Sequence, residues 1–265
     1  MSETPITDKT KGRKHTYHSE ANVLTGFLTL PLNQKIQPQA YANLPGEGGY
    51  FDQRLENYKL GEVISIRSAY TQVAGNLDPK EDKGWSTLTT TVVEGFNVLD
   101  VLTADRIVGQ IITEYPLVGY IPKISFLGTR FENLRIAGHP IEVDIATDLF
   151  TRHSTWSKLS HAYENDQAFR SEVGKLSMIQ AKGKKLPEGH GTLGVTLARN
   201  LDKLPRGLER RDHGIYVPHF GTVYLAEYFI SRHAQRLLML HVDLGCAVEG
   251  RGGLGCGQNN GSTYP

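Results

Sequence analysis

The chain has 265 residues, of which 39% are hydrophobic, and its 29 basic and 28 acidic side chains give a net charge of +1. This length suits one large β domain. A nearly neutral chain lacks the clustered, uncompensated cations that binding to a nucleic-acid backbone requires, so we expect no nucleic-acid partner. No segment approaches the roughly 20 apolar residues that span a bilayer as a helix, so we expect no membrane span.

The first part of the chain lacks the features of a folded or exported segment. Residues 1–14 contain no apolar core of a secretory leader. Their low hydrophobicity cannot offset the entropy lost on ordering. We therefore expect a flexible N-terminal arm and a cytoplasmic location, unless export follows a route that needs no leader.

Residues 15–247 are expected to form one β domain, because most of this region alternates apolar and polar side chains or is rich in β-branched residues. Ile141, Val143 and Ile145 alternate with Glu142 and Asp144, which predicts the clearest half-buried strand of the chain. The other predicted strands cover residues 17–32, 62–73, 87–93, 98–103, 106–113, 123–129, 131–136, 192–197, 214–217, 222–230 and 238–244. Gly95 is expected to interrupt the third of these runs.

Between residues 154 and 186 the hydrophobic period changes from two to that of a helix. Trp156, Leu159 and Tyr163 are three and four residues apart, and a second set with this spacing follows Asp166, a residue type that caps helices. We predict two short helices, inserted at about residues 150–187. Residues 248–265 are rich in Gly and Asn and are predicted to form an irregular tail. The expected fold is mainly β, an antiparallel β-sandwich or open barrel with a small two-helix insertion.

Three residues are the best candidates for acid or base chemistry if the protein is an enzyme: Asp100, Asp105 and His219. Paired carboxylates suit hydrolysis of a glycosidic bond, and Asp144 could join them if the strands bring it close. The structural interpretation is that Asp100 caps a turn and that Asp105 pairs with Arg106 or Arg130. We favour the structural interpretation and expect no catalytic residue.

Metal and cofactor motifs are missing from the sequence. No close run of acidic residues matches a calcium loop, and neither H-E-x-x-H nor G-x-S-x-G occurs. We expect no metal and no cofactor. Cys246 and Cys256 are ten residues apart, and a disulfide between them would stabilise the chain by about 2–3 kcal/mol. A cytosolic location would instead keep both thiols reduced, so the two states stay open.

Tyrosines are the candidates for a binding surface. The chain has twelve tyrosines against nine phenylalanines, and tyrosine provides large, rigid contact area at interfaces and in carbohydrate sites. We select Tyr115, Tyr120, Tyr216 and Tyr224 as candidate binding residues, with carbohydrate as one candidate ligand.

Two segments carry a resemblance to known proteins. Residues 97–106 read N-V-L-D-V-L-T-A-D-R, and residues 131–138 read F-E-N-L-R-I-A-G. Together with the apolar strand at residues 238–246, they resemble a large group of uncharacterised bacterial β-rich proteins. The central segment is similar to choice-of-anchor P type domains, in which a T-A-D segment precedes an N-L-R strand. The chain departs from these domains in its N-terminus and its helical insertion, and the resemblance implies no activity and no catalytic residue.

We predict a non-enzymatic binding or structural protein that self-associates into a homo-oligomer or a larger assembly. Long strands with exposed edges are templates for pairing with another chain, and the terminal arms could contribute. One alternative is a hydrolase or isomerase that acts on a carbohydrate or small lipid in a sandwich groove. A second alternative is a carrier of a small ligand, which needs an enclosed apolar cavity.

Overall fold

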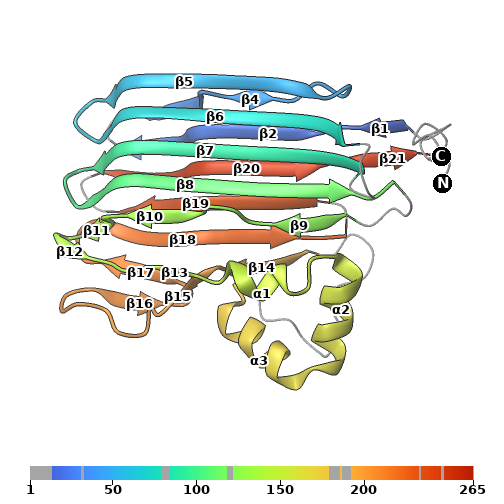
Figure 1. The fold of residues 1–265 in the computed structure, drawn as a ribbon. Coiled ribbons are helices and arrows are strands. Elements are labelled where there is room, and N and C mark those ends of the chain that lie inside the picture. Colours follow the sequence, from blue (N-terminus) through green and yellow to red (C-terminus); the bar gives the residue numbers. More distant parts are fainter. Residues whose placement is uncertain are drawn as a thin grey trace, which may run out of the picture.

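The protein is an antiparallel β-sandwich of two large sheets with a small helical unit at one end (Figure 1). This computed structural model describes residues 14–30, 33–78, 84–117, 122–178, 186, 192–232, 234–245 and 248–264, without the side chains of 260, 263 and 264. The N-terminal arm predicted at residues 1–14 lies outside the described residues except for Lys14. No helix in the described part of the chain is long and apolar enough to cross a membrane.

The first sheet has eight strands and is built mainly from a consecutive meander. Its main path runs in the order β12, β11, β8, β7, β6, β5, and β9 and β10 pair with β8. The bounds are β5 (Gly49–Leu60), β6 (Ile64–Asp78), β7 (Gly84–Val98), β8 (Leu102–Tyr115), β9 (Lys123–Ser125), β10 (Arg130–Glu132), β11 (Arg135–Ile136) and β12 (His139–Pro140). Within this sheet, β7 has the largest share of buried residues, which fits its content of Thr and Val.

The second sheet has nine strands and joins both ends of the sequence. Its main path runs in the order β16, β17, β18, β19, β20, β2, β3, with β14 beside β18 and β4 beside β2. The bounds are β2 (Ser19–Leu30), β3 (Gln34–Gln39), β4 (Ala42–Asn43), β14 (Leu193–Thr196), β16 (Glu209–Arg211), β17 (Gly214–Val217), β18 (Gly221–Ile230), β19 (Ala234–Leu244) and β20 (Glu249–Asn260). Two small ladders join β1 (Lys14–Thr16) to β21 (Ser262–Tyr264) and β13 (Asp144–Ile145) to β15 (Ala198–Arg199).

The two predicted helices are confirmed as α2 (Trp156–Asn165) and α3 (Gln167–Leu176), and a short α1 (Thr147–Thr151) precedes them. The side chain of Asp166 accepts hydrogen bonds from the backbone N–H groups of Ala168 at 2.9 Å and Phe169 at 3.0 Å, so it caps α3 as its residue type predicts. Leu159 and Tyr163 on α2 and Phe169 on α3 are buried, which confirms the helical period.

Three predicted segments are wrong. The strand predicted at residues 98–103 is interrupted at residues 99–101, which form the turn between β7 and β8. The expected irregular tail contains β20, a central strand paired with both β19 and β2. The backbones of β20 and β2 approach each other closely. A Cβ atom on Gly26 of β2 would lie 2.5 Å from the carbonyl oxygen of Arg251 on β20, so this contact requires glycine. Of the half-buried strand predicted at residues 141–145, only Asp144–Ile145 forms a strand, because alternation specifies a face and not a pairing partner.

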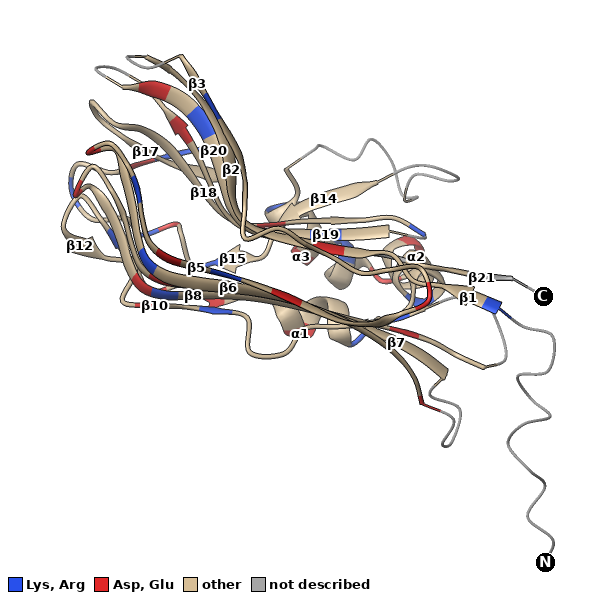
Figure 2. Ribbon diagram, turned by 90° about the horizontal axis from the view of Figure 1, so that it is seen from above, with Lys and Arg blue, Asp and Glu red and all other residues tan. Residues whose placement is uncertain are grey.

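A row of irregular pairings crosses both sheets. On β7 the ladder skips Gly95 (φ 61°), but the strand continues past it to Val98. The break that the sequence predicted at Gly95 is therefore wrong. On β18 and β20 the ladder skips Ala226 (φ 49°) and Gly255 (φ 65°). The strands bend midway, and the two sheets diverge at the end away from the helices (Figure 2). Such irregularities change the face on which the following side chains lie.

The interior between the sheets is apolar at one end and polar at the other. At the polar end, the Ser19 hydroxyl donates to Asn259 Oδ1 at 2.9 Å and lies 2.5 Å from the Thr89 hydroxyl. Tyr228 donates to Gln235 at 3.0 Å, and Gln235 in turn donates to Thr113. These groups are buried and partnered, which is the condition for keeping polar side chains in a core.

Candidate functional site

A cluster of interacting polar and charged side chains surrounds the buried Glu227 on the outer face of the second sheet. We call it the Glu227 cluster: His213, Tyr224, Glu227, His241, Asp243 and Arg251. Pairing of β18 with β19 places Tyr224 opposite His241, and pairing of β19 with β20 places Asp243 opposite Arg251. Glu227 reaches the same face as Tyr224 although they are three residues apart, because the ladder skips Ala226 between them.

The polar side chains of the cluster form a continuous chain of hydrogen bonds. Oε1 of Glu227 lies 3.1 Å from His213 Nε2, and Oε2 lies 3.0 Å from His241 Nδ1. The other ring nitrogen of His241 lies 3.1 Å from Asp243 Oδ1. Arg251 then donates to both carboxylate oxygens of Asp243, at 2.5 and 3.1 Å. The Tyr224 ring lies between the two imidazoles, with ring centroids 4.8 and 4.9 Å away.

These contacts keep Glu227 ionised in spite of its burial. The Glu227 side chain is only 7% exposed, and burial alone would raise the pKa of its carboxyl group. The hydrogen bonds and charges of His213 and His241 outweigh that effect and lower the pKa of Glu227 from 4.5 to about 2. For His241, burial acts to lower the pKa, but the hydrogen bonds and charges of Glu227 and Asp243 outweigh it and raise the pKa.

The arrangement suits a fixed ion network better than acid or base catalysis. Both nitrogens of His241 are held by carboxylates, so the ring has no free position for a substrate proton. A carboxyl group whose pKa is about 2 is a weak base at neutral pH. In the described part of the chain, no group of three or more His, Cys, Asp or Glu side chains is placed to hold a metal ion.

Beside the cluster lies a groove of about 480 Å³, which we call the Gly253 groove. Gly26 on β2 and Gly252 and Gly253 on β20 form its floor, where the sheet carries no side chains. Its walls come from four strands, β2, β18, β19 and β20. The walls are formed by Thr25, Phe27, Glu227, Phe229, Arg236, Leu238, His241 and Arg251.

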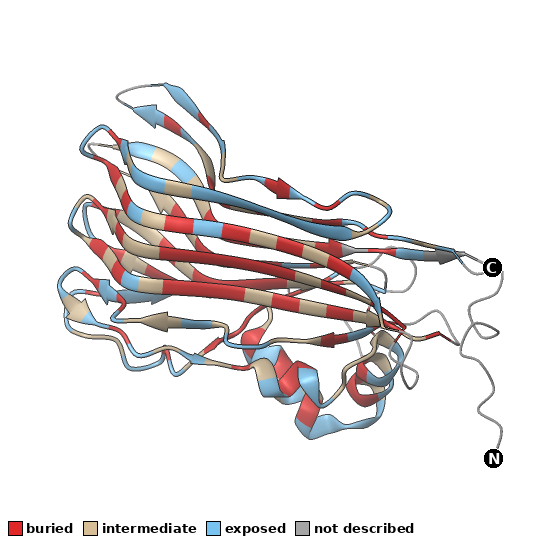
Figure 3. Cartoon of the chain, turned by 45° about the horizontal axis from the view of Figure 1, so that its top comes forward, coloured by how far each residue is buried: buried red, intermediate tan, exposed pale blue. Residues whose placement is uncertain are grey.

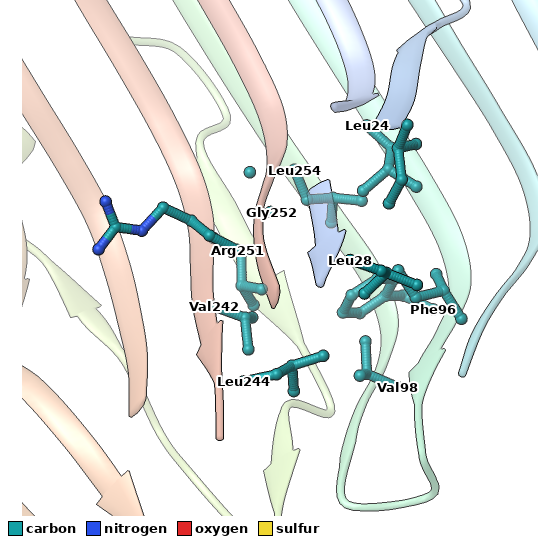
Figure 4. Close-up of a pocket in the computed structure, with 13 residues that line it drawn as sticks. Leu24, Leu28, Phe96, Val98, Val242, Leu244, Arg251, Gly252 and Leu254 are labelled. Carbon is teal, nitrogen blue, oxygen red and sulfur yellow. The ribbon is translucent and has the colours of Figure 1, made fainter. Parts of the chain in front are cut away.

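A second opening lies on the inner side of β20, between the two sheets. Figure 4 shows Leu24, Leu28, Val242 and Leu244 of one sheet close to Phe96 and Val98 of the other. Apart from Arg251, the side chains that line the opening are apolar, but its free volume is only about 30 Å³. Ligand pockets usually measure roughly 300–1,000 Å³, so this slot does not favour the carrier alternative.

The predicted acidic candidates have separate structural partners. Asp100 lies in the turn between β7 and β8, where its backbone N–H donates to Asn97 Oδ1 at 2.8 Å and its carboxylate accepts from Asn97 Nδ2 at 2.5 Å. This agrees with the expected turn role. Asp105 was expected to pair with an arginine, but its carboxylate accepts from Asn133 Nδ2 at 2.6 Å. Asp144 lies 3.9 Å from Arg199 on the neighbouring strand.

The arginines that were expected beside Asp105 have other partners, since Arg106 lies 3.7 Å from Glu94 and Arg130 lies 2.7 Å from Glu132. His219 is exposed in the turn between β17 and β18 and is not a member of the Glu227 cluster. The sequence candidates therefore do not include the charged residues that the sheet brings together.

The four candidate tyrosines have different environments. Tyr224 belongs to the Glu227 cluster. Tyr216 is half-buried, with the Arg211 guanidinium 3.3 Å above its ring. Tyr115 is buried and donates to the Gly261 carbonyl at 2.6 Å, which is a core role. Tyr120 lies outside the described residues.

Of the two cysteines, Cys256 is a buried free thiol on β20, and burial raises its pKa. Cys246 lies outside the described residues, so the predicted disulfide stays a prediction.

A family model described as "Domain of unknown function (DUF8256)" matches residues 15–199. No curated protein and no solved structure matches the chain. The matched segment contains the whole first sheet and strands β2, β3, β4 and β14 of the second. Because it covers well over half of the 265 residues, the chain belongs to the family of the domain of unknown function DUF8256.

Proposed function

We propose that this protein is a non-enzymatic structural or binding protein that self-associates, and that two copies pair through the edge strand β5. The observation that supports this proposal is the exposure of β5. In the described part of the chain, only β6 pairs with it. Of its 12 residues, only Leu55, Tyr58 and Leu60 are not exposed, so most of the strand lacks cover on its faces as well as on its free edge (Figure 3).

The other sheet edges are less suitable for pairing. β12 has 2 residues and β16 has 3, which are too short to template a ladder. β3 contains Pro38, which cannot donate a backbone hydrogen bond. The ends β1 and β21 already pair with each other within the chain. β5 is therefore the long, unblocked edge among the described strands.

The charges of β5 complement those of a second copy. Asp52, Arg54 and Glu56 alternate in sign on one face of the strand. In an antiparallel pair with Gln53 opposite its own copy, Asp52 of each chain faces Arg54 of the other, and Phe51 faces Leu55. A run of like charges would protect an edge from pairing, whereas this alternation favours it.

Light scattering after size-exclusion chromatography tests the proposal. We expect the wild-type chain to dimerise as concentration rises. Asp52→Arg or Arg54→Asp alone places like charges opposite each other twice per dimer and should weaken dimerisation by about tenfold or more. The double swap Asp52→Arg/Arg54→Asp should restore it. Arg206→Asp, at an exposed turn away from β5, is the control for net charge.

A cysteine cross-link tests the register. Opposed residues in an antiparallel pair lie about 4.5–5.5 Å apart between Cα atoms, within disulfide range. Oxidised Gln53→Cys should therefore form a covalent dimer in high yield, and Leu127→Cys, which replaces an exposed side chain elsewhere, should not. A wild-type chain that stays monomeric at high concentration, or a double swap no better than the single changes, would contradict the proposal.

A further inference from the structure

The geometry points to a binding site for a small amphipathic anion, a carboxylate with an apolar body, in the Gly253 groove. This groove lies on the outer face of the second sheet, and the proposal does not depend on pairing through β5. It rests on the shape of the groove floor, on the balance of charge around it and on its apolar walls.

The floor is low because glycine occupies the position where a side chain would project. Gly253 lies between His241 on β19 and Thr25 on β2 in the pairing register. A Cβ atom on Gly253 would lie 2.9 Å from Leu238 Cδ1, so the Leu238 side chain packs over Gly253 in the space that a side chain there would take. An ordinary side chain at this position would push Leu238 outward into the groove.

The charge that faces the groove is positive. Arg236, Arg251 and His241 line it, whereas Glu227 is the single carboxylate in the lining and is nearly buried against two imidazoles. Arg236 is exposed on β19, and no carboxylate of the described residues forms an ion pair with it.

Arg251 is held in a fixed orientation for an incoming anion. Its Nε and one terminal nitrogen donate to Asp243, and the other terminal nitrogen donates to no group in the described part of the chain. A guanidinium that is oriented before the ligand arrives loses less entropy on binding.

The apolar part of the site comes from three side chains. Phe27 is 40% exposed, and Phe229 and Leu238 line the groove near Arg236. Phe229 and Arg236 are directly opposite each other in the β18 and β19 ladder. A ligand body that rests on these side chains can bring its carboxylate to the arginines, which explains why we infer an amphipathic anion instead of a simple inorganic one.

Isothermal titration calorimetry of the full chain with 4-phenylbutyrate tests this inference. We expect saturable binding in the millimolar range or tighter. The neutral isostere 4-phenylbutan-1-ol lacks the carboxylate, and inorganic phosphate lacks the apolar body. Each should bind at least about tenfold more weakly than 4-phenylbutyrate. Phosphate that binds as well as 4-phenylbutyrate would contradict the amphipathic class, and absence of saturable binding would overturn the site.

Variants locate the binding. Arg236→Gln should weaken binding of 4-phenylbutyrate by about tenfold or more, and Phe27→Ala should weaken it by severalfold. Gly253→Val displaces Leu238 into the groove and should abolish binding while circular dichroism shows an intact fold. Arg206→Gln is the matched control and should bind like wild type. Equal affinity of Arg236→Gln and Arg206→Gln would overturn the assignment, whatever the oligomeric state of the chain.

Discussion

Replacing the buried carboxylate by its neutral isostere, Glu227→Gln, should destabilise the protein in a way that depends on pH. Lowering the pKa of Glu227 from 4.5 to about 2 corresponds to roughly 3 kcal/mol of stability at neutral pH, at about 1.4 kcal/mol per pH unit. Glutamine keeps part of the hydrogen bonding to His213 and His241. We therefore expect a loss of about 2–3 kcal/mol in the free energy of unfolding at pH of about 5.5.

The sign of the pH dependence follows from both shifts. Because the pKa of Glu227 is lowered on folding, its contribution is complete above 4.5 and is lost as pH falls toward 2. Because the pKa of His241 is raised on folding, its contribution is complete below 6.5 and is lost as pH rises through its folded-state value. The difference between wild type and Glu227→Gln should therefore be largest near pH 5–6 and decrease on either side, to less than half near pH of about 3.

Urea unfolding followed by circular dichroism from pH of about 3 to 8 measures this difference. Glu209→Gln is the control, because Glu209 lies 3.1 Å from Arg211 in an exposed ion pair and should cost less than about 1 kcal/mol at every pH. The loss of unfolding free energy in Glu227→Gln could instead be constant between pH 3 and 5.5, or no larger than that in Glu209→Gln. Either result would refute the account in which ionised Glu227 stabilises the fold through His213 and His241.

Two further substitutions test the packing of β20. Gly26→Ala should destabilise the protein by about 1–3 kcal/mol in urea unfolding, because the new methyl group meets the backbone of Arg251, whereas Gly245→Ala has no atom within 4 Å and should be nearly neutral. Asn259→Leu should cost about 2–4 kcal/mol, measured by the shift in Tm, because the buried hydroxyl groups of Ser19, Thr89 and Thr113 each lose a hydrogen bond. The exposed Gln37→Leu should shift Tm little.

The local elements could be predicted from the sequence because their signals are local. β-branched density marks β7, and the alternation of leucine and valine with His241 and Asp243 marks β19 and correctly places these two polar residues on one face. The helical spacing after Thr155 marks α2. Each of these signals lies within about ten residues.

The Glu227 cluster could not be predicted in the same way. His241 and Asp243 are visible as outward polar residues of one strand, but Glu227 reaches that face only because Ala226 drops out of the ladder at φ 49°. A single alanine has no propensity for that conformation, so the sequence carries no local signal for it. His213 arrives through the pairing of β17 with β18, which is a relation between strands.

Glycine composition was misleading for a related physical reason. Gly-rich segments usually form irregular tails because glycine loses the most entropy on ordering. In β20 the neighbouring strands on both sides provide a complete ladder, and the absence of side chains allows the close approach seen at Gly26. The same absence leaves room for the Leu238 side chain above Gly253. Composition alone cannot distinguish a strand enclosed by two neighbours from a free end.

The position of β20 also determines how the family match relates to the site. The matched residues 15–199 include β2 and β3, but β18, β19 and β20 lie after residue 199. β2 is joined to the rest of the second sheet through β20. The matched segment therefore forms the second sheet only together with strands that lie outside the match. Glu227, His241, Asp243 and Arg251 come from those later strands and His213 from the turn before β17, whereas Thr25 and Phe27 come from the matched part. The groove is therefore a composite of both segments, and relatives that share only the matched segment would retain the first sheet and the β5 edge without the arginines that we assign to anion binding.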